Sequence, residues 1–258
     1  MAVVRTGSSD AVLTITLDRP AALNAFERQM KVELLAALKA AERDASVRVL
    51  VITGAGRAFS AGQDLKERET VGAADLSDEL RERYNPIIHT MRRMEKPIVA
   101  AVNGVAAGAG FSLVLACDLV VASDEARFIQ AFSRVGLIPD TGSTWFLPRR
   151  VGWARAAELM MLAEPLDAAG AERLGLVNRV VPADQLMVEA RGLAGRLAGA
   201  PPIALALTKR AMYQGLLADL DGQLDLEAQL QSVAGRSEDH REGVAAFAQK
   251  RPARFTGR

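Results

Sequence analysis

Two segments rich in small residues are the parts of this sequence best suited to chemistry. They span residues 57–65 (RAFSAGQDL) and 103–110 (NGVAAGAG), and each follows a short apolar run typical of a buried strand. Small residues let the backbone approach a ligand closely, and the second segment leads into a predicted helix whose first N–H groups have no intrahelical partner. Two such loops side by side can direct two N–H donors at one oxygen. That arrangement is an oxyanion hole, which suits a carbonyl that gains negative charge during a reaction.

Each segment taken alone also has a plainer interpretation. A tight strand-to-helix turn is often built from small residues for packing, and for one loop by itself this interpretation is favoured. Neither segment contains G-x-x-x-x-G-K-[ST], and neither contains G-x-G-x-x-G followed by an acidic ribose ligand. We therefore expect neither a phosphate-cradling loop nor a nucleotide cofactor.

Asp140, in the segment GLIPDTGSTW, is a candidate acid/base. A positioned carboxylate can transfer a proton to or from a reacting group. An aspartate ahead of Thr-Gly-Ser is equally typical of a helix N-cap, where its oxygen accepts hydrogen bonds from the first N–H groups. From these residues alone, the cap and the catalyst are equally open interpretations.

Strands alternate with helices in the first half of the chain, which predicts a layered α/β fold. Short β-branched and apolar runs predict strands at residues 11–17, 47–53, 98–102 and 119–122. Apolar spacing predicts helices between them, at residues 27–43, 77–94 and 111–117. Asn24 is a candidate N-cap for the first of these helices.

Helices dominate after residue 139. Apart from a strand signal at residues 176–181, the pattern predicts helices at residues 142–150, 154–162, 168–174, 182–197, 203–217, 220–234 and 238–248. Pro201-Pro202 marks a boundary, because the residue before a proline disfavours helix. We predict a core of residues 1–198 that carries the site and a C-terminal helical region of residues 199–258. The apolar faces of these last helices must pack on the core or on a neighbouring subunit.

The composition excludes several classes of protein and site. A formal net charge of +1 gives no general attraction to nucleic acid or to an acidic membrane. The sole cysteine, Cys117, stands in an apolar run and is interpreted as a small buried hydrophobe, so no internal disulfide or Cys/His metal site is expected. The N-terminus lacks an apolar signal region, and the longest apolar stretch is interrupted by Asn103 and by glycines. We expect a cytoplasmic protein without a membrane span.

Three segments, in a fixed order, carry a resemblance to a known family. AFSAGQDL, KPIVAAVNGVAAGAGFSLVLACDLVVAS and ARFIQAFSRVGLIPDTGSTWFLPRRVG resemble the enoyl-CoA hydratase/isomerase (crotonase) family, and the resemblance covers nearly the whole chain. It implies an α/β fold that is a crotonase-like spiral of β-β-α units, with C-terminal helices that build a homotrimer or a dimer of trimers. It also implies an acyl-CoA thioester as substrate, with no separate cofactor.

The same resemblance assigns site residues. It places the oxyanion-hole donors at the backbone N–H groups of Gln63 and Ala109. Other positions of the family's motifs approach coenzyme A, the last two at its adenine end: Asn24, Ala25, Phe26, Ala61, Leu65, Lys209 and Phe255.

One departure from the family pattern bears on the reaction. Hydratases of the family use two glutamates, and Ser112 and Phe132 stand at those positions here. Hydration needs one group to activate water and another to protonate carbon, and neither residue does this near neutral pH. The segments AGQDL, YNPII and GLIPDTGSTW resemble the subfamily that isomerises ring-1,2-epoxyphenylacetyl-CoA to oxepin-CoA. That resemblance implies Asp140 as the acid/base.

The expected function is therefore acyl-CoA isomerisation through a thioester enolate, from 3-enoyl to 2-enoyl esters, from the ring epoxide to the oxepin, or both. Two alternatives stay open at this point. The chain is a hydratase with a relocated acid/base pair or a related acyl-CoA lyase, or it is a non-catalytic acyl-CoA-binding protein.

Overall fold

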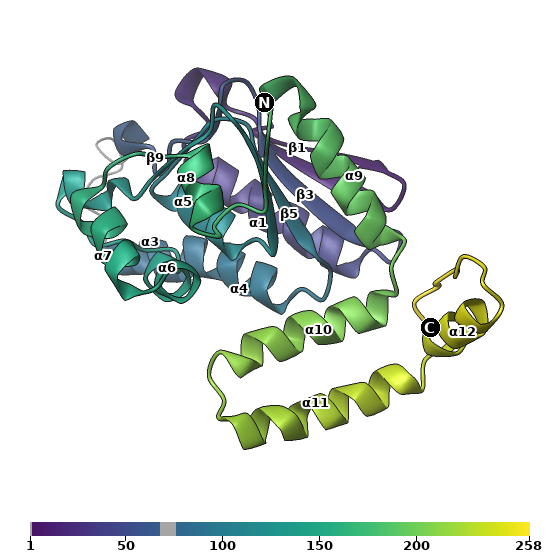
Figure 1. Ribbon diagram of the computed structural model, residues 1–258. Helices are drawn as coiled ribbons and strands as arrows, with labels where there is room; N and C mark the ends of the chain where they lie inside the picture. The colour runs from purple at the N-terminus through teal and green to yellow at the C-terminus, as the bar shows by residue number, and fades with distance from the viewer. Residues whose placement is uncertain (1, 68–75) are drawn as a thin grey trace.

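The computed structural model describes residues 2–67 and 76–258 and contains two β-sheets. Six strands form the larger sheet, in the order β1-β2-β3-β5-β7-β10: Val4–Ser9, Val12–Leu17, Val49–Gly54, Ile98–Val102, Leu119–Ser123 and Arg179–Val181. Four short strands form the smaller sheet, in the order β4-β6-β8-β9: Ala58–Ser60, Val105–Ala107, Arg127–Ile129 and Leu166–Asp167. Figure 1 shows the larger sheet in the middle of the molecule.

Successive pairs of strands contribute to both sheets, and this makes the fold a spiral. Strands β3, β5 and β7 run parallel in the larger sheet. Each continues directly into a strand of the smaller sheet, and these strands, β4, β6 and β8, are also parallel. Helices follow each pair before the next begins. The predicted crotonase-like spiral of β-β-α units is confirmed.

Helices cover both faces of the larger sheet. Strand β3 is buried on both faces, which explains its continuous β-branched sequence. Its Val49 and Val51 pack against α9 (Leu186–Ala198), whereas Leu50 and Ile52 face the main core. The main core includes the apolar sides of α1 (Arg28–Arg43) and α4 (Asn85–Arg93), and Figure 1 shows these helices across the sheet from α9.

The remaining helical segments surround the site or extend the chain. They are α3 (Leu76–Glu79), the π-helical turn η2 (Leu80–Tyr84), α5 (Ala109–Ala116), η3 (Ala131–Val135), α6 (Ser143–Val151), α7 (Trp153–Leu162), α8 (Ala168–Arg173), α10 (Pro202–Gly215), α11 (Leu220–Gly235) and α12 (Glu238–Ala248). Most of them match the predicted helices closely. No helix within residues 2–67 and 76–258 is long and apolar enough to span a bilayer.

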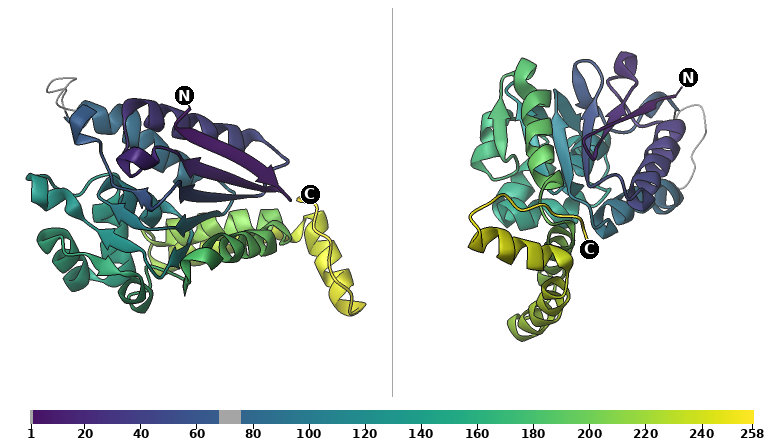
Figure 2. Two further views of the ribbon diagram at one scale, coloured as in Figure 1. Left: turned by 90° about the horizontal axis from the view of Figure 1, so that it is seen from above. Right: turned by 90° about the vertical axis from the view of Figure 1, so that its right-hand side faces the viewer.

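The C-terminal helices project from the two sheets. Figure 1 shows α11 and α12 beyond the edge of the sheets, and α12 also projects from the body in the left view of Figure 2. They carry exposed apolar side chains, with Phe247 88% and Leu220 71% exposed. Exposed apolar surface of this kind is typical of an interface. The predicted boundary at residue 198 coincides with the end of α9, and the role of residues 199–258 in oligomerisation stays a prediction.

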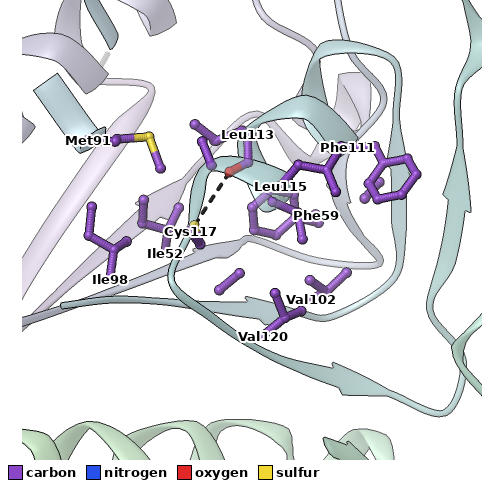
Figure 3. Close-up of a cluster of buried hydrophobic side chains, with 14 of the residues drawn as sticks. Ile52, Phe59, Met91, Ile98, Val102, Phe111, Leu113, Leu115, Cys117 and Val120 are labelled. Carbon is purple, nitrogen blue, oxygen red and sulfur yellow. Dashed lines mark hydrogen bonds between the residues drawn. The ribbon is translucent and has the colours of Figure 1, made fainter. Parts of the chain in front are cut away.

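Cys117 lies in the main core. Figure 3 shows it among apolar side chains, with its thiol donating a hydrogen bond to the carbonyl oxygen of Leu113. Its side chain is fully buried, and burial together with the nearby Asp118 carboxylate raises the pKa of the thiol to about 12. The interpretation of Cys117 as a buried hydrophobe is confirmed.

Candidate active site

A pocket of about 220 Å³ brings together residues that are far apart in the sequence. Its described lining includes five of the predicted site residues: Ala61, Gln63, Leu65, Ala109 and Asp140. Apolar side chains from the middle of the chain line it too: Leu76, Leu80, Phe132, Val135 and Leu137. Besides Gln63 and Asp140, the polar side chains in the described lining belong to Arg28, Glu67, Glu79, Arg83 and Tyr84. Both glycine-rich segments and the candidate acid/base therefore border one space.

The two glycine-rich loops touch each other behind this pocket. Gly62 has φ of +91°, and a Cβ on it would lie 2.8 Å from the carbonyl oxygen of Ala107 and 3.4 Å from the nitrogen of Ala109. Only glycine fits so close an approach at a positive φ. Gly108, also at positive φ, turns the second loop into α5, so that Ala109 is the first helical residue.

The backbone N–H groups of Gln63 and Ala109 are both available as donors. Within the described part of the chain, neither donates a hydrogen bond to another protein group. The Ala109 N–H lies at the start of α5, where unpaired amides and the helix dipole favour a negative charge. Both residues line the pocket, so their N–H groups are candidate donors to a carbonyl oxygen there.

Residues 24–26 hold the first of these loops in place. The Phe26 N–H donates to the Gly62 carbonyl at 2.7 Å, and the Asp64 N–H donates to the Phe26 carbonyl at 3.0 Å. Gln63 is paired with Phe26 between these two bonds. The Gly62 carbonyl and the Gln63 N–H belong to the same peptide group. Because that carbonyl is held by the Phe26 N–H, the orientation of the Gln63 N–H is fixed as well.

The buried side chain of Asn24 links its own loop to residues 55–58 by hydrogen bonds. Its amide donates to the carbonyls of Ala55 and Ala58 at 2.9 and 2.7 Å, and its Oδ1 accepts from the Arg19 N–H. The prediction that it caps the first helix is wrong, because Glu27 is the N-cap residue of α1. The side chains of residues 24–26 are buried and outside the pocket lining, so their contact with coenzyme A stays a prediction.

Asp140 does not cap α6. The helix begins at Ser143 with Gly142 as its N-cap residue and without a capping side chain. Thr141 and Gly142 both have positive φ, at +53° and +85°, and this tight turn sets Asp140 in the pocket wall. The Asp140 carboxylate accepts a hydrogen bond from the Thr141 hydroxyl at 2.7 Å. The N-cap interpretation is therefore wrong, and the carboxylate borders the same pocket as the two donors.

A buried lysine beside the pocket escaped the sequence analysis. Lys31 of α1 is only 2% exposed; its ammonium donates to Oε1 of Gln63 at 3.1 Å and pairs with Glu79. The Tyr84 hydroxyl donates to the same Gln63 oxygen at 2.6 Å. Tyr84 belongs to a π-helical turn, a feature frequent at functional sites. The sequence did indicate that Lys31 is buried, because Lys31 lies at helical spacing on the same apolar face as Leu34 and Leu38.

Asp64 has a structural role. Its carboxylate accepts from the Lys66 N–H at 3.0 Å and pairs with Arg19 at 2.9 Å. Burial raises the pKa of Asp64, but the hydrogen bonds from Arg19 and from the loop N–H groups outweigh it, so the net shift is downward. The carboxylate thus fixes the loop that follows Gln63.

Lys209 and Phe255 lie away from the pocket. The buried Lys209 ammonium pairs with Asp118 at 2.8 Å and donates to the carbonyl oxygens of Met91 and Lys96, so it ties α10 to the end of α4. A contact of Lys209 with the adenine end of coenzyme A stays a prediction. The Phe255 carbonyl accepts from Arg48 on the body of the protein. A contact of Phe255 with coenzyme A in a neighbouring subunit stays a prediction.

Comparison with known proteins agrees with this geometry. The chain matches the enoyl-CoA hydratase/isomerase family over residues 7–258. It is 47% identical over 250 residues to the 1,2-epoxyphenylacetyl-CoA isomerase of Escherichia coli strain K12, covering 96% of this chain and 95% of that protein. It is 39% identical over 247 residues to the 2,3-dehydroadipyl-CoA hydratase of the same strain, covering 96% of each.

A solved structure shares the whole fold. An enoyl-CoA hydratase from Polaromonas sp. JS666 has a TM-score of 0.93 at 36% identity, covering 98% of this chain and 99% of that one. The family match and the relatives each span nearly the full chain. The protein therefore belongs to the enoyl-CoA hydratase/isomerase family.

Proposed function

We propose that this protein is an acyl-CoA isomerase that works through a thioester enolate with Asp140 as its single acid/base. The thioester oxygen docks between the N–H groups of Gln63 and Ala109. Asp140 removes a proton from the α carbon and returns it at the γ carbon, which moves a 3-enoyl double bond to the 2-position. One carboxylate suffices because the proton is shuttled and no water is consumed.

The observation that carries the proposal is the shared pocket. Two backbone N–H groups that have no acceptor among the described residues and one carboxylate that is not the N-cap of α6 border the same space. Charge develops on the thioester oxygen only in the transition state and the enolate, so donors fixed beforehand stabilise those states selectively. A single oxyanion-hole donor is worth about 10²–10³ in kcat.

The acyl group is proposed from chemistry and from similarity together. The apolar wall formed by Leu76, Leu80 and Phe132 suits an unsaturated chain or a ring. The 47% identical relative is named as a 1,2-epoxyphenylacetyl-CoA isomerase, which supports the ring epoxide as a second substrate class. We propose 3-enoyl-CoA and ring-1,2-epoxyphenylacetyl-CoA esters as substrates, with coenzyme A as part of the substrate and no separate cofactor.

The test is the Asp140→Asn variant, assayed with both classes of ester. We expect kcat to fall by about 10²–10⁴-fold, the usual contribution of a positioned acid/base, with the melting temperature nearly unchanged. Exchange of the α proton in deuterated water, followed by NMR, should be lost in parallel. The exposed Asp184→Asn variant removes the same charge away from the pocket and should behave as wild type. Near-normal turnover by Asp140→Asn would reject the assignment.

A hydratase is the second candidate, and one observation favours it. Glu67 and Glu79 both line the pocket, so carboxylates are present although Ser112 and Phe132 replace the expected pair. Incubation with crotonyl-CoA in ¹⁸O-labelled water separates the two functions. Net incorporation of the label, lost in Glu67→Gln or Glu79→Gln, would establish hydration in place of isomerisation.

A further inference from the structure

A chain of buried polar side chains lies behind the pocket and joins its two catalytic loops. Gln130, Ser143 and Ser112 are each at most 1% exposed. The Gln130 amide donates to the Ser143 hydroxyl at 3.1 Å, and the hydroxyls of Ser143 and Ser112 are 2.6 Å apart. The Ser112 hydroxyl lies 3.1 Å from the carbonyl oxygens of both Gly108 and Asp140.

One assignment of the protons accounts for all four contacts of this chain. The NH₂ group of Gln130 donates to Ser143, and Ser143 donates its own proton to Ser112. Ser112 in turn donates its single proton to the two carbonyls, which accept only. The Ser112 hydroxyl is therefore a donor shared between two loops, and its orientation is fixed by its neighbours.

The two carbonyls belong to the residues that matter most for the proposed reaction. Gly108 directly precedes Ala109, whose N–H is a proposed oxyanion donor, and Asp140 is the proposed acid/base. Each carbonyl also accepts a backbone N–H, from Ser112 and Ser143 respectively, so each holds two hydrogen bonds. One hydroxyl thus bridges the donor loop and the acid/base loop across 28 positions of sequence.

We propose that Ser112 is a positioning residue that fixes the Asp140 carboxylate relative to the Ala109 N–H. This inference rests on the proposed function. Ser112 is outside the pocket lining, so it acts through the two loops and not on the substrate. Its effect is on geometry, because a misplacement of about 1 Å between reacting groups can cost about 10²-fold in rate.

The test compares Ser112→Ala with Ser123→Ala, in the wild-type protein and in Asp140→Asn. Ser123 is also fully buried, but its hydroxyl bonds Asp124 and Glu125 in another part of the core. We expect Ser112→Ala to lower kcat by about 10–100-fold with KM within about threefold, because binding groups are intact. Ser123→Ala should change kcat by less than about threefold at a similar loss of stability.

Coupling to Asp140 is the decisive readout. If Ser112 acts by placing Asp140, Ser112→Ala should cost little further activity once Asp140→Asn is present, and the two losses should not multiply. Ser143→Ala, which removes the group that orients Ser112, should lower kcat in the same sense but less. Ser112→Thr, which keeps the hydroxyl, should recover part of the activity.

Three results would overturn the inference: wild-type kcat in Ser112→Ala, multiplicative losses in the double variant, or equal losses in Ser123→Ala. If Ser112→Ala does not fold, the same comparison is made with Ser143→Ala. A wild-type kcat in that variant would also reject the positioning role of Ser112. An active Asp140→Asn variant would instead reject the proposed function itself. An inactive Asp140→Asn beside a fully active Ser112→Ala would reject only the positioning role.

Discussion

Gly62→Ala is the sharpest test of the two-loop geometry, because the structure predicts both a strain and a collision. The residue has φ of +91°, where a side chain costs roughly 1–2 kcal/mol. The new Cβ would also lie 2.8 Å from the Ala107 carbonyl oxygen, closer than atoms of these kinds pack. The backbone strain lowers stability alone, whereas the steric collision also pushes the two glycine-rich loops apart.

The size of the loss in kcat depends on how far the collision displaces the two backbone N–H donors. Ala107 is two residues before Ala109, and Gly62 is next to Gln63, so relief of the collision displaces at least one of the two N–H donors by several tenths of an ångström. Complete loss of one such donor costs about 10²–10³ in kcat. Because the donor is displaced and not removed, we expect a loss of about 10–100-fold in kcat.

Gly175→Ala is the matched control. Gly175 also has a positive φ, +73°, but its Cβ would meet no atom within 4 Å, and it lies outside the pocket lining. Both variants should lose about 1–2 kcal/mol in urea unfolding from the backbone strain. Steady-state turnover of a 3-enoyl-CoA should then separate them, with Gly175→Ala close to wild type. Equal kcat in the two variants would refute the reasoning that the loops must touch for the donors to be placed.

Two further predictions concern the core. Because the pKa of the Cys117 thiol is raised to about 12, it stays protonated at pH 8 and should not react with a thiol reagent such as DTNB until the protein is unfolded in urea; rapid labelling of the folded protein would contradict its burial. Lys209→Met leaves the Asp118 carboxylate without its ammonium partner and should lower the free energy of unfolding by about 3 kcal/mol, measured by urea denaturation. The exposed Lys39→Met should change it by less than about 0.5 kcal/mol, and equal effects would show that the pair contributes nothing.

Apolar periodicity was sufficient to place the long helices of this fold. Helix α12 has the predicted bounds, and α1 and α11 differ from theirs by one residue, because a long amphipathic stripe repeats its signal many times. Strands β4 and β6 were missed inside the glycine-rich segments, because a strand of three residues is too short to show a period. These short strands matter, because they build the second sheet and deliver both donor loops.

The site was predictable where chemistry and spacing coincide, and not where tertiary contacts decide. Gln63, Ala109 and Asp140 were identified from motifs, and the structure brings them to one pocket. The cap role of Asp140 could not be judged, since it depends on α6 beginning three residues later. Lys209 has no sequence signal of burial either, because its partner Asp118 lies 91 residues away.

The two positions where hydratase glutamates are absent also favour isomerisation on physical grounds. Ser112 directs its hydroxyl at two backbone carbonyls, and the Phe132 ring lies close enough to Gly108 that a Cβ there would be 3.8 Å from it. Neither side chain can move a proton at the substrate. Two other carboxylates stand in the described lining, and both are engaged: Glu79 is paired with Lys31 and Arg83, and Glu67 accepts from the Arg28 N–H. Hydration would have to recruit one of them as its second acid/base, whereas an α-to-γ proton transfer needs only Asp140.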